Sequence, residues 1–220
     1  MTNLGGTSFD YLLKFIIIGD DVVGKSNLLS HYVQGQFKSE YQSTIGVEFG
    51  AKNVVIRNTT YRIQIWDAGG RESLRKITRT YFKNTVCALV VYDISNRNSF
   101  NNVSSWIEDC RYNSPKTIFM VLVGNKSDLA DKRQVSTEEG RELAEKYEMK
   151  FYETSAKIGE NVNDIFYDSV DEIAKKMDQN YYDLENDTCG IKQGINRQNH
   201  NPVLNLGGGG GRQKEDKGCC

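Results

Sequence analysis

The chain has 220 residues, 38% hydrophobic and 10% aromatic, which suits one α/β domain with a remainder or two small domains. Its formal net charge of −1 gives no electrostatic reason to expect nucleic-acid binding. We find no apolar run long enough to cross a bilayer and no signal-peptide pattern before residue 10. The five cysteines show no zinc-like spacing, and their odd count argues against a secreted disulfide framework, so we expect reduced thiols in the cytosol.

The first predicted elements are a strand, a glycine loop and a helix. Residues 11–18 are largely apolar and rich in β-branched side chains, which predicts a buried strand. Residues 19–26 fit the phosphate-loop pattern G-x-x-x-x-G-K-[ST] at every fixed position. In residues 26–33 the apolar side chains share one helical face. This order aims backbone N–H groups at a polyphosphate, with Lys25 reaching the phosphates and Ser26 reaching Mg²⁺. The alternative is a glycine turn without a ligand.

The rest of the first 177 residues alternates between strand and helix patterns. A polar loop (35–46) precedes a predicted hairpin (47–57 and 61–66), and predicted strands follow at 86–92, 118–123 and 150–153. Helices are predicted at 72–83, 99–112, from a capping box at Ser136, and at 162–177. The pattern predicts a three-layer α/β fold with a mostly parallel six-stranded sheet and helices on both faces.

The two ends of the chain have a different composition. Residues 1–10 are expected to form a short extension, and residues 11–177 the globular domain. Beyond 178 the sequence is polar and contains five consecutive glycines (207–211), so 178–217 is predicted to be a flexible linker before the C-terminal cysteines.

Two further motifs resemble the guanine-binding elements of small GTPases, which are P-loop NTPases. Asn125-Lys126-Ser127-Asp128 follows an apolar strand, and Ser155-Ala156-Lys157 follows the last one. A carboxylate at Asp128 can accept two hydrogen bonds from guanine, whereas adenine would leave it unpaired. The resemblance implies that Lys126 and Phe37 cover the two faces of the base and that Asn125 ties the phosphate loop to the base site. It also implies that the Ala156 N–H holds the guanine carbonyl oxygen.

The same resemblance implies the remaining ligands of GTP or GDP and of Mg²⁺. Ser26, Thr44 and Asp67 match the metal-holding residues, and Gly70 matches the glycine whose N–H touches the γ-phosphate. Thr44, Gly70 and Arg71, at the catalytic glutamine position, form the catalytic group. The full set expected at the nucleotide comprises Asp21, Val22, Val23, Gly24, Lys25, Ser26, Asn27, Phe37, Tyr41, Thr44, Gly70, Asn125, Lys126, Asp128, Ser155, Ala156 and Lys157.

Finer features resemble the Rab family, most closely its Rab-two branch. Ile45 lies in the segment Ile-Gly-Val-Glu-Phe after switch I, and Phe49, Trp66 and Tyr81 match the aromatic triad that Rab effectors contact. Ordinary packing is the alternative for these aromatics. The terminal Cys219 and Cys220 resemble a doubly prenylated end, the alternative being two unmodified thiols, and two lipid chains would anchor stably.

The Rab resemblance also implies partners and a location. It implies effectors, an exchange factor, an activating protein, the prenylation machinery and a GDP-dissociation inhibitor around a monomeric switch. The expected location is the cytosol and the cytoplasmic face of membranes between endoplasmic reticulum and Golgi.

The sequence departs from the family pattern in two segments. Switch II usually reads Asp-Thr-Ala-Gly-Gln-Glu, but here Arg71 replaces the glutamine that orients water, and Ala68 and Gly69 replace the threonine and alanine. In the phosphate loop Val22 replaces a glycine, which would cost roughly 1–3 kcal/mol at positive φ, and Asp21 brings a carboxylate close to phosphate. Two functions therefore remain open: a membrane-anchored switch with slow GTP hydrolysis, or an interaction module of the same fold, nucleotide-binding or nucleotide-free, without useful turnover.

Overall fold

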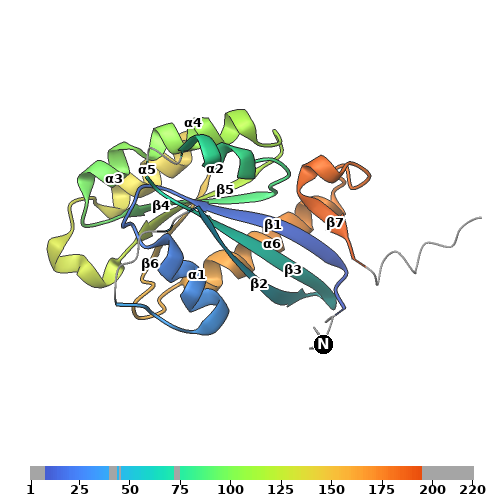
Figure 1. The fold of residues 1–220 in the computed structure, drawn as a ribbon, viewed down its shortest axis with the longest axis horizontal. Coiled ribbons are helices and arrows are strands. Elements are labelled where there is room, and N and C mark those ends of the chain that lie inside the picture. Colours follow the sequence, from blue (N-terminus) through green and yellow to red (C-terminus); the bar gives the residue numbers. More distant parts are fainter. Residues whose placement is uncertain (1–7, 40–43, 45, 72–74, 195–220) are drawn as a thin grey trace, which may run out of the picture.

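The computed structural model describes residues 8–39, 44, 46–71 and 75–194. It is a three-layer α/β molecule around one twisted sheet (Figure 1). The strands run β2 (Val47–Ile56), β3 (Thr59–Ala68), β1 (Tyr11–Ile18), β4 (Cys87–Asp93), β5 (Phe119–Asn125) and β6 (Lys150–Thr154) across the sheet. The pairs β1–β3, β1–β4, β4–β5 and β5–β6 are parallel, and only β2 runs antiparallel along this path. This confirms the predicted fold class.

Helices cover both faces of the sheet. On one face lie α1 (Lys25–Gln34) and α6 (Val162–Asp178). On the other lie α2 (Arg75–Tyr81), α3 (Arg97–Asn101), α4 (Val103–Asn113) and α5 (Thr137–Lys146) (Figure 1). The predicted helix over 99–112 is wrong in one respect, because it is two helices separated at Asn102. The Asn96 side chain caps the first of them by accepting from the N–H groups of Asn98 and Ser99, which starts that helix earlier than periodicity indicates.

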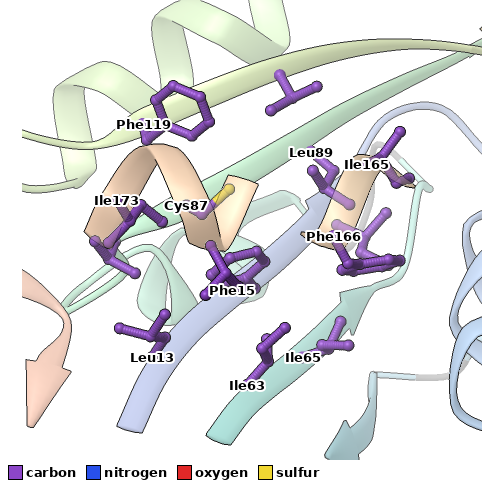
Figure 2. Packing of buried hydrophobic residues seen from close by; sticks show 14 of the residues in the cluster. Leu13, Phe15, Ile63, Ile65, Cys87, Leu89, Phe119, Ile165, Phe166 and Ile173 are labelled. Atoms are coloured by element: carbon purple, nitrogen blue, oxygen red, sulfur yellow. The ribbon is translucent and has the colours of Figure 1, made fainter. Parts of the chain in front are cut away.

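Alternation along β1 divides the core into two clusters. Leu13, Phe15 and Ile17 point toward α1 and α6, whereas Ile16 and Ile18 point toward α4 and α5. Figure 2 shows the first cluster, in which the Phe15 ring stacks against Phe166 of α6 with ring centroids 6.4 Å apart. All these side chains are fully buried, so both faces of β1 are apolar, as expected for a central parallel strand.

The capping box predicted at Ser136 is present. Ser136 accepts from the N–H of Glu139, and the Glu139 carboxylate accepts from the N–H of Ser136 at 2.9 Å. Arg97 adds a two-pronged ion pair to the same carboxylate. These contacts fix the start of α5 against the start of α3.

The region after 178 differs from the predicted linker. A 3₁₀ turn (Asp187–Cys189) and a seventh strand, β7 (Ile191–Gln193), return to the sheet and pair antiparallel with the start of β1. Tyr182, Cys189 and Ile191 are buried in the core cluster beneath α6. Three buried apolar side chains offset the ordering of this short segment, so the packed unit continues to Gly194. Residues 195–220, including Cys219 and Cys220, lie outside the described residues, as do Tyr41, Ile45 and residues 72–74.

Candidate functional site

The phosphate loop lies at the carboxyl end of β1 and leads directly into α1. Gly24, the residue before the helix, has a φ of 98°, and a Cβ there would lie 2.4 Å from Nδ2 of Asn125. Only glycine therefore fits between the loop and β5. Helix α1 has no acidic side chain in its first turn and no side-chain cap, so its first N–H groups face the cavity without an internal carboxylate cap.

Loops at the carboxyl ends of the parallel strands enclose a cavity of about 890 Å³. From the expected nucleotide set it is lined by Asp21, Val22, Gly24, Lys25, Ser26, Asn27, Phe37, Thr44, Gly70, Asn125, Lys126, Asp128, Ala156 and Lys157. Lys38, Ser39, Glu48 and Leu129 also line it and were not expected. No sequence motif marks them, because each lies beside a motif residue in a loop or strand whose course the sequence does not specify.

Two of the expected residues act from behind the cavity wall. Val23 is buried and gives its carbonyl oxygen to Nδ2 of Asn125 at 2.8 Å. Ser155 is buried and donates to Oδ1 of Asp128 at 2.5 Å. Asn27 lines the cavity, but its side chain bonds both the N–H and the carbonyl of Lys38. These three residues position the wall of the cavity.

Asn125 organises the end of the cavity at which the guanine base is expected, called here the base end. Its side-chain oxygen accepts from the Thr154 hydroxyl and from the Ala156 N–H, both at 3.2 Å. The Ala156 amide, expected to hold a guanine oxygen, is thus already engaged at the long end of the hydrogen-bond range. Lys126 forms a 2.7 Å ion pair with Asp93 at the end of β4. Lys126 and Asp128 both line the cavity.

Three oxygens converge at the phosphate end. The Ser26 hydroxyl lies 2.9 Å from the Thr44 hydroxyl and donates to Oδ2 of Asp67 at 2.5 Å. Asp67 is fully buried, and its Oδ1 has no hydrogen-bond partner within the described part of the chain. Two hydroxyls and a carboxylate suit a hard divalent cation, and an orphaned carboxylate oxygen marks a place for one. The residues therefore fit Mg²⁺.

Burial dominates the electrostatics of this end. Burial lowers the pKa of Lys25, and the charge of Asp67 opposes the shift. Burial likewise raises the pKa of Asp67 to about 6, against the charge of Lys25. Lys25 Nζ donates to the carbonyl oxygen of Asp20 at 2.7 Å. The ammonium is thus held inside the loop, where it can meet a phosphate oxygen.

The unusual loop residues take strained or charged positions. Val22 has a φ of 67°, which confirms that its position requires positive φ, and its side chain is 56% exposed. Arg71 Nε lies 3.4 Å from Oδ2 of Asp21, so two residues that depart from the family pattern contact each other. No pattern in the sequence indicates this contact, because 50 residues separate the partners.

The aromatic triad of Phe49, Trp66 and Tyr81 lies on the face of β3 that points away from α6. Phe49 and Trp66 meet edge to face with ring centroids 5.1 Å apart, and Trp66 lies 5.5 Å from Tyr81. Phe49 is half exposed, so the group combines packing with an accessible aromatic surface.

The fold and this loop define a P-loop nucleotide-binding protein. A sequence profile of the Ras family matches residues 14–175. The chain is also 47% identical over 174 residues to the Ras-related protein Rab-2B of Dictyostelium discoideum, a match covering 79% of this chain and 86% of that protein. The chain therefore belongs to the Ras family, and within it to the Rab small GTPases of the Rab2 branch.

None of the helices in the described ranges is both long and apolar enough to span a bilayer.

Proposed function

We propose that the protein is a GTP-binding molecular switch of vesicle-mediated membrane traffic. One observation carries this: a single cavity holds the phosphate loop and the Ser26, Thr44 and Asp67 oxygens at one end and Asp128 at the other. These two ends match a nucleoside di- or triphosphate with its metal, which has a base at one end and a charged phosphate chain at the other. We propose traffic between endoplasmic reticulum and Golgi as the setting, as the sequence resemblance to the Rab-two branch implies.

Guanine specificity rests on Asp128. The Ser155 hydroxyl donates to one carboxylate oxygen of Asp128 and fixes that side chain in the cavity. The other carboxylate oxygen can then accept hydrogen bonds from N–H groups of a bound base. Guanine offers two adjacent N–H donors, whereas adenine would leave the Asp128 acceptor unpaired. Phe37 and Lys126 line the same region and would cover the faces of the base.

Mg²⁺ would be held by Ser26, Thr44 and Asp67, directly or through water. Bound there, it would neutralise charge on the terminal phosphates during phosphoryl transfer. The chain's own contribution would be positioning: Lys25 and the loop amides would hold the phosphates, and Thr44 and Gly70 line the same cavity.

The nucleotide assignment is tested by chromatography of nucleotide released from the purified protein, where we expect GDP or GTP. Asp128→Asn should weaken GTP binding and admit xanthosine triphosphate, because the amide donates where the carboxylate accepted. The matched control is Asp131→Asn, which changes an exposed carboxylate on the same 3₁₀ helix as Asp128 (Ser127–Lys132) and should alter neither property. Equal affinity of the wild type for ATP and GTP would contradict the assignment.

We further propose that hydrolysis is slow because Arg71 stands at the glutamine position. Arginine has five donors and no acceptor, so it cannot accept a hydrogen bond from the attacking water. Single-turnover hydrolysis of preloaded GTP should be faster in Arg71→Gln, because glutamine can both accept a hydrogen bond from the attacking water and donate one. A wild type as fast as the variant would favour an arginine acting as a finger in cis. No measurable turnover in either, with nucleotide bound, would favour the interaction module.

Membrane attachment through Cys219 and Cys220 completes the proposal. Two lipid chains anchor stably, and the chain beyond 178 lacks a basic cluster that would add much affinity. The prenylation machinery, a GDP-dissociation inhibitor, an exchange factor, an activating protein and effectors at Phe49, Trp66 and Tyr81 are the partners this implies for a monomer. A Cys219→Ser/Cys220→Ser protein should leave the membrane fraction of cells. Unchanged sedimentation would point to another anchor.

A further inference from the structure

The carboxylate of Asp21 is held between two donors from different segments. Its Oδ1 accepts the N–H of Val22 at 3.1 Å, and its Oδ2 accepts from Nε of Arg71 at 3.4 Å. The first donor belongs to the phosphate loop and the second to switch II. One side chain therefore links the two segments that surround the end of a bound triphosphate.

The backbone places Arg71 beside this carboxylate. At Gly70 a Cβ would lie 2.4 Å from the carbonyl carbon of Asp20 and 2.5 Å from the amide nitrogen of Asp21. Such distances leave no room for a side chain, so switch II begins in direct contact with the phosphate loop. Because Arg71 follows Gly70, its guanidinium starts next to the loop and need not reach across solvent.

The two donors that Asp21 uses are of the kinds that bind phosphate. Loop amides between Gly19 and Ser26 form an anion-binding nest, and guanidinium groups pair with phosphate oxygens. A carboxylate oxygen and a phosphate oxygen are both anionic acceptors. Asp21 therefore engages, within the loop, an amide and a cation that a terminal phosphate would otherwise use.

We infer that Asp21 is a specificity-determining residue that lowers the preference for GTP over GDP, and that Arg71 exchanges between Asp21 and the γ-phosphate. This inference rests on the proposed guanine-nucleotide binding and concerns only the third phosphate. GDP lacks the group that competes with Asp21, so its affinity is little affected. The ion pair is half exposed, so we expect an effect of about twofold to fivefold that shrinks with added salt.

The test is a double-substitution cycle with Asp21→Asn, Arg71→Gln and both together. For each protein we would measure dissociation constants for GDP and for a non-hydrolysable GTP analogue, with Mg²⁺, at two salt concentrations. The ratio of the two constants isolates the γ-phosphate. Asparagine keeps the shape of Asp21 and its hydrogen bond to Val22 but removes the charge.

With Arg71 present, Asp21→Asn should raise the preference for the triphosphate analogue about twofold to fivefold, because the guanidinium is released to the γ-phosphate. In the Arg71→Gln background the same substitution should give less than half of that gain, since only direct repulsion is removed. Arg71→Gln alone should lower the preference. Arg57→Gln, which breaks an exposed ion pair to Asp171 at the hairpin turn, is the matched control and should leave the ratio unchanged.

Equal gains in both backgrounds would show that Asp21 repels phosphate without exchanging Arg71, and would overturn the inference. An unchanged ratio in Asp21→Asn would overturn it as well. If either of these two results is found and GDP still binds tightly, only this inference is overturned and the proposed function is not. A wild type that binds neither nucleotide contradicts the proposed function itself.

Discussion

The Nδ2 atom of Asn125 donates to the carbonyl oxygen of Val23 across 2.8 Å and joins the end of β5 to the phosphate loop. The side-chain oxygen accepts from Thr154 and Ala156. Asn125 is 1% exposed, so its loss would strand these groups without water to replace it. One buried amide thus couples the phosphate end of the cavity to the base end.

Asn125→Ala should therefore cost about 1–3 kcal/mol of unfolding free energy and speed nucleotide release. Denaturant unfolding and the dissociation rate of a fluorescent GDP would measure the two effects. Asn113→Ala removes a hydrogen bond of similar length to the Asp109 carbonyl in α4, away from the cavity, and should leave nucleotide release unchanged. If Asn125→Ala leaves the dissociation rate of GDP unaltered, the Asn125 amide does not contribute to nucleotide binding.

Much of this arrangement could be predicted from sequence because its determinants are local. The apolar run of β1, the glycine loop and the capping box at Ser136 each specify an element within a few residues. The segment from Tyr182 to Ile191 could not, because its polar composition concealed three side chains that are buried only by long-range pairing with β1. The contact between Asp21 and Arg71 is equally non-local.

Val22→Gly should stabilise the protein by up to about 1 kcal/mol. Removing the strain of the positive φ stabilises the folded state by roughly 1–2 kcal/mol. Glycine also raises the conformational entropy of the unfolded chain, which offsets part of this stabilisation. The side chain is mostly exposed, so little packing is lost. Val55→Gly, at an exposed valine within β2, should instead destabilise. A lower denaturant midpoint for Val22→Gly would mean that the loop has adapted to valine.

Ile191→Ala should cost about 2–5 kcal/mol, because the side chain is 1% exposed within the core cluster beneath α6. Chemical denaturation would measure the loss, with Glu185→Gln in the preceding exposed turn as the control. A cost below about 0.5 kcal/mol, typical of surface positions, would contradict the docking of β7.

Acid should weaken the junction of α3 and α5. The hydrogen bonds from Arg97 and from Ser136 lower the pKa of Glu139 to about 2, below its ordinary value of 4.5. A depressed pKa means that Glu139 contributes stability above about pH 4.5 and loses it as the pH falls toward 2. The difference in thermal midpoint between wild type and Glu139→Gln should narrow over this range. Glu142→Gln on the same helix is the control, and a constant difference from pH 7 to 2 would refute the assignment.

The C-terminal strand also determines where a tether would begin. The Gly194 N–H donates to the carbonyl of Asp10 at 2.8 Å, just before β1 begins, whereas the cavity is lined by the phosphate loop that follows the other end of that strand. The 25 residues from 195 to Cys219 have a fully extended length of roughly 80–90 Å, which is an upper limit. A lipid-anchored molecule could therefore turn its cavity and aromatic triad toward the cytosol. Deleting residues from the segment 195–219 would shorten the distance from the membrane at which the molecule can bind a partner on an opposing membrane.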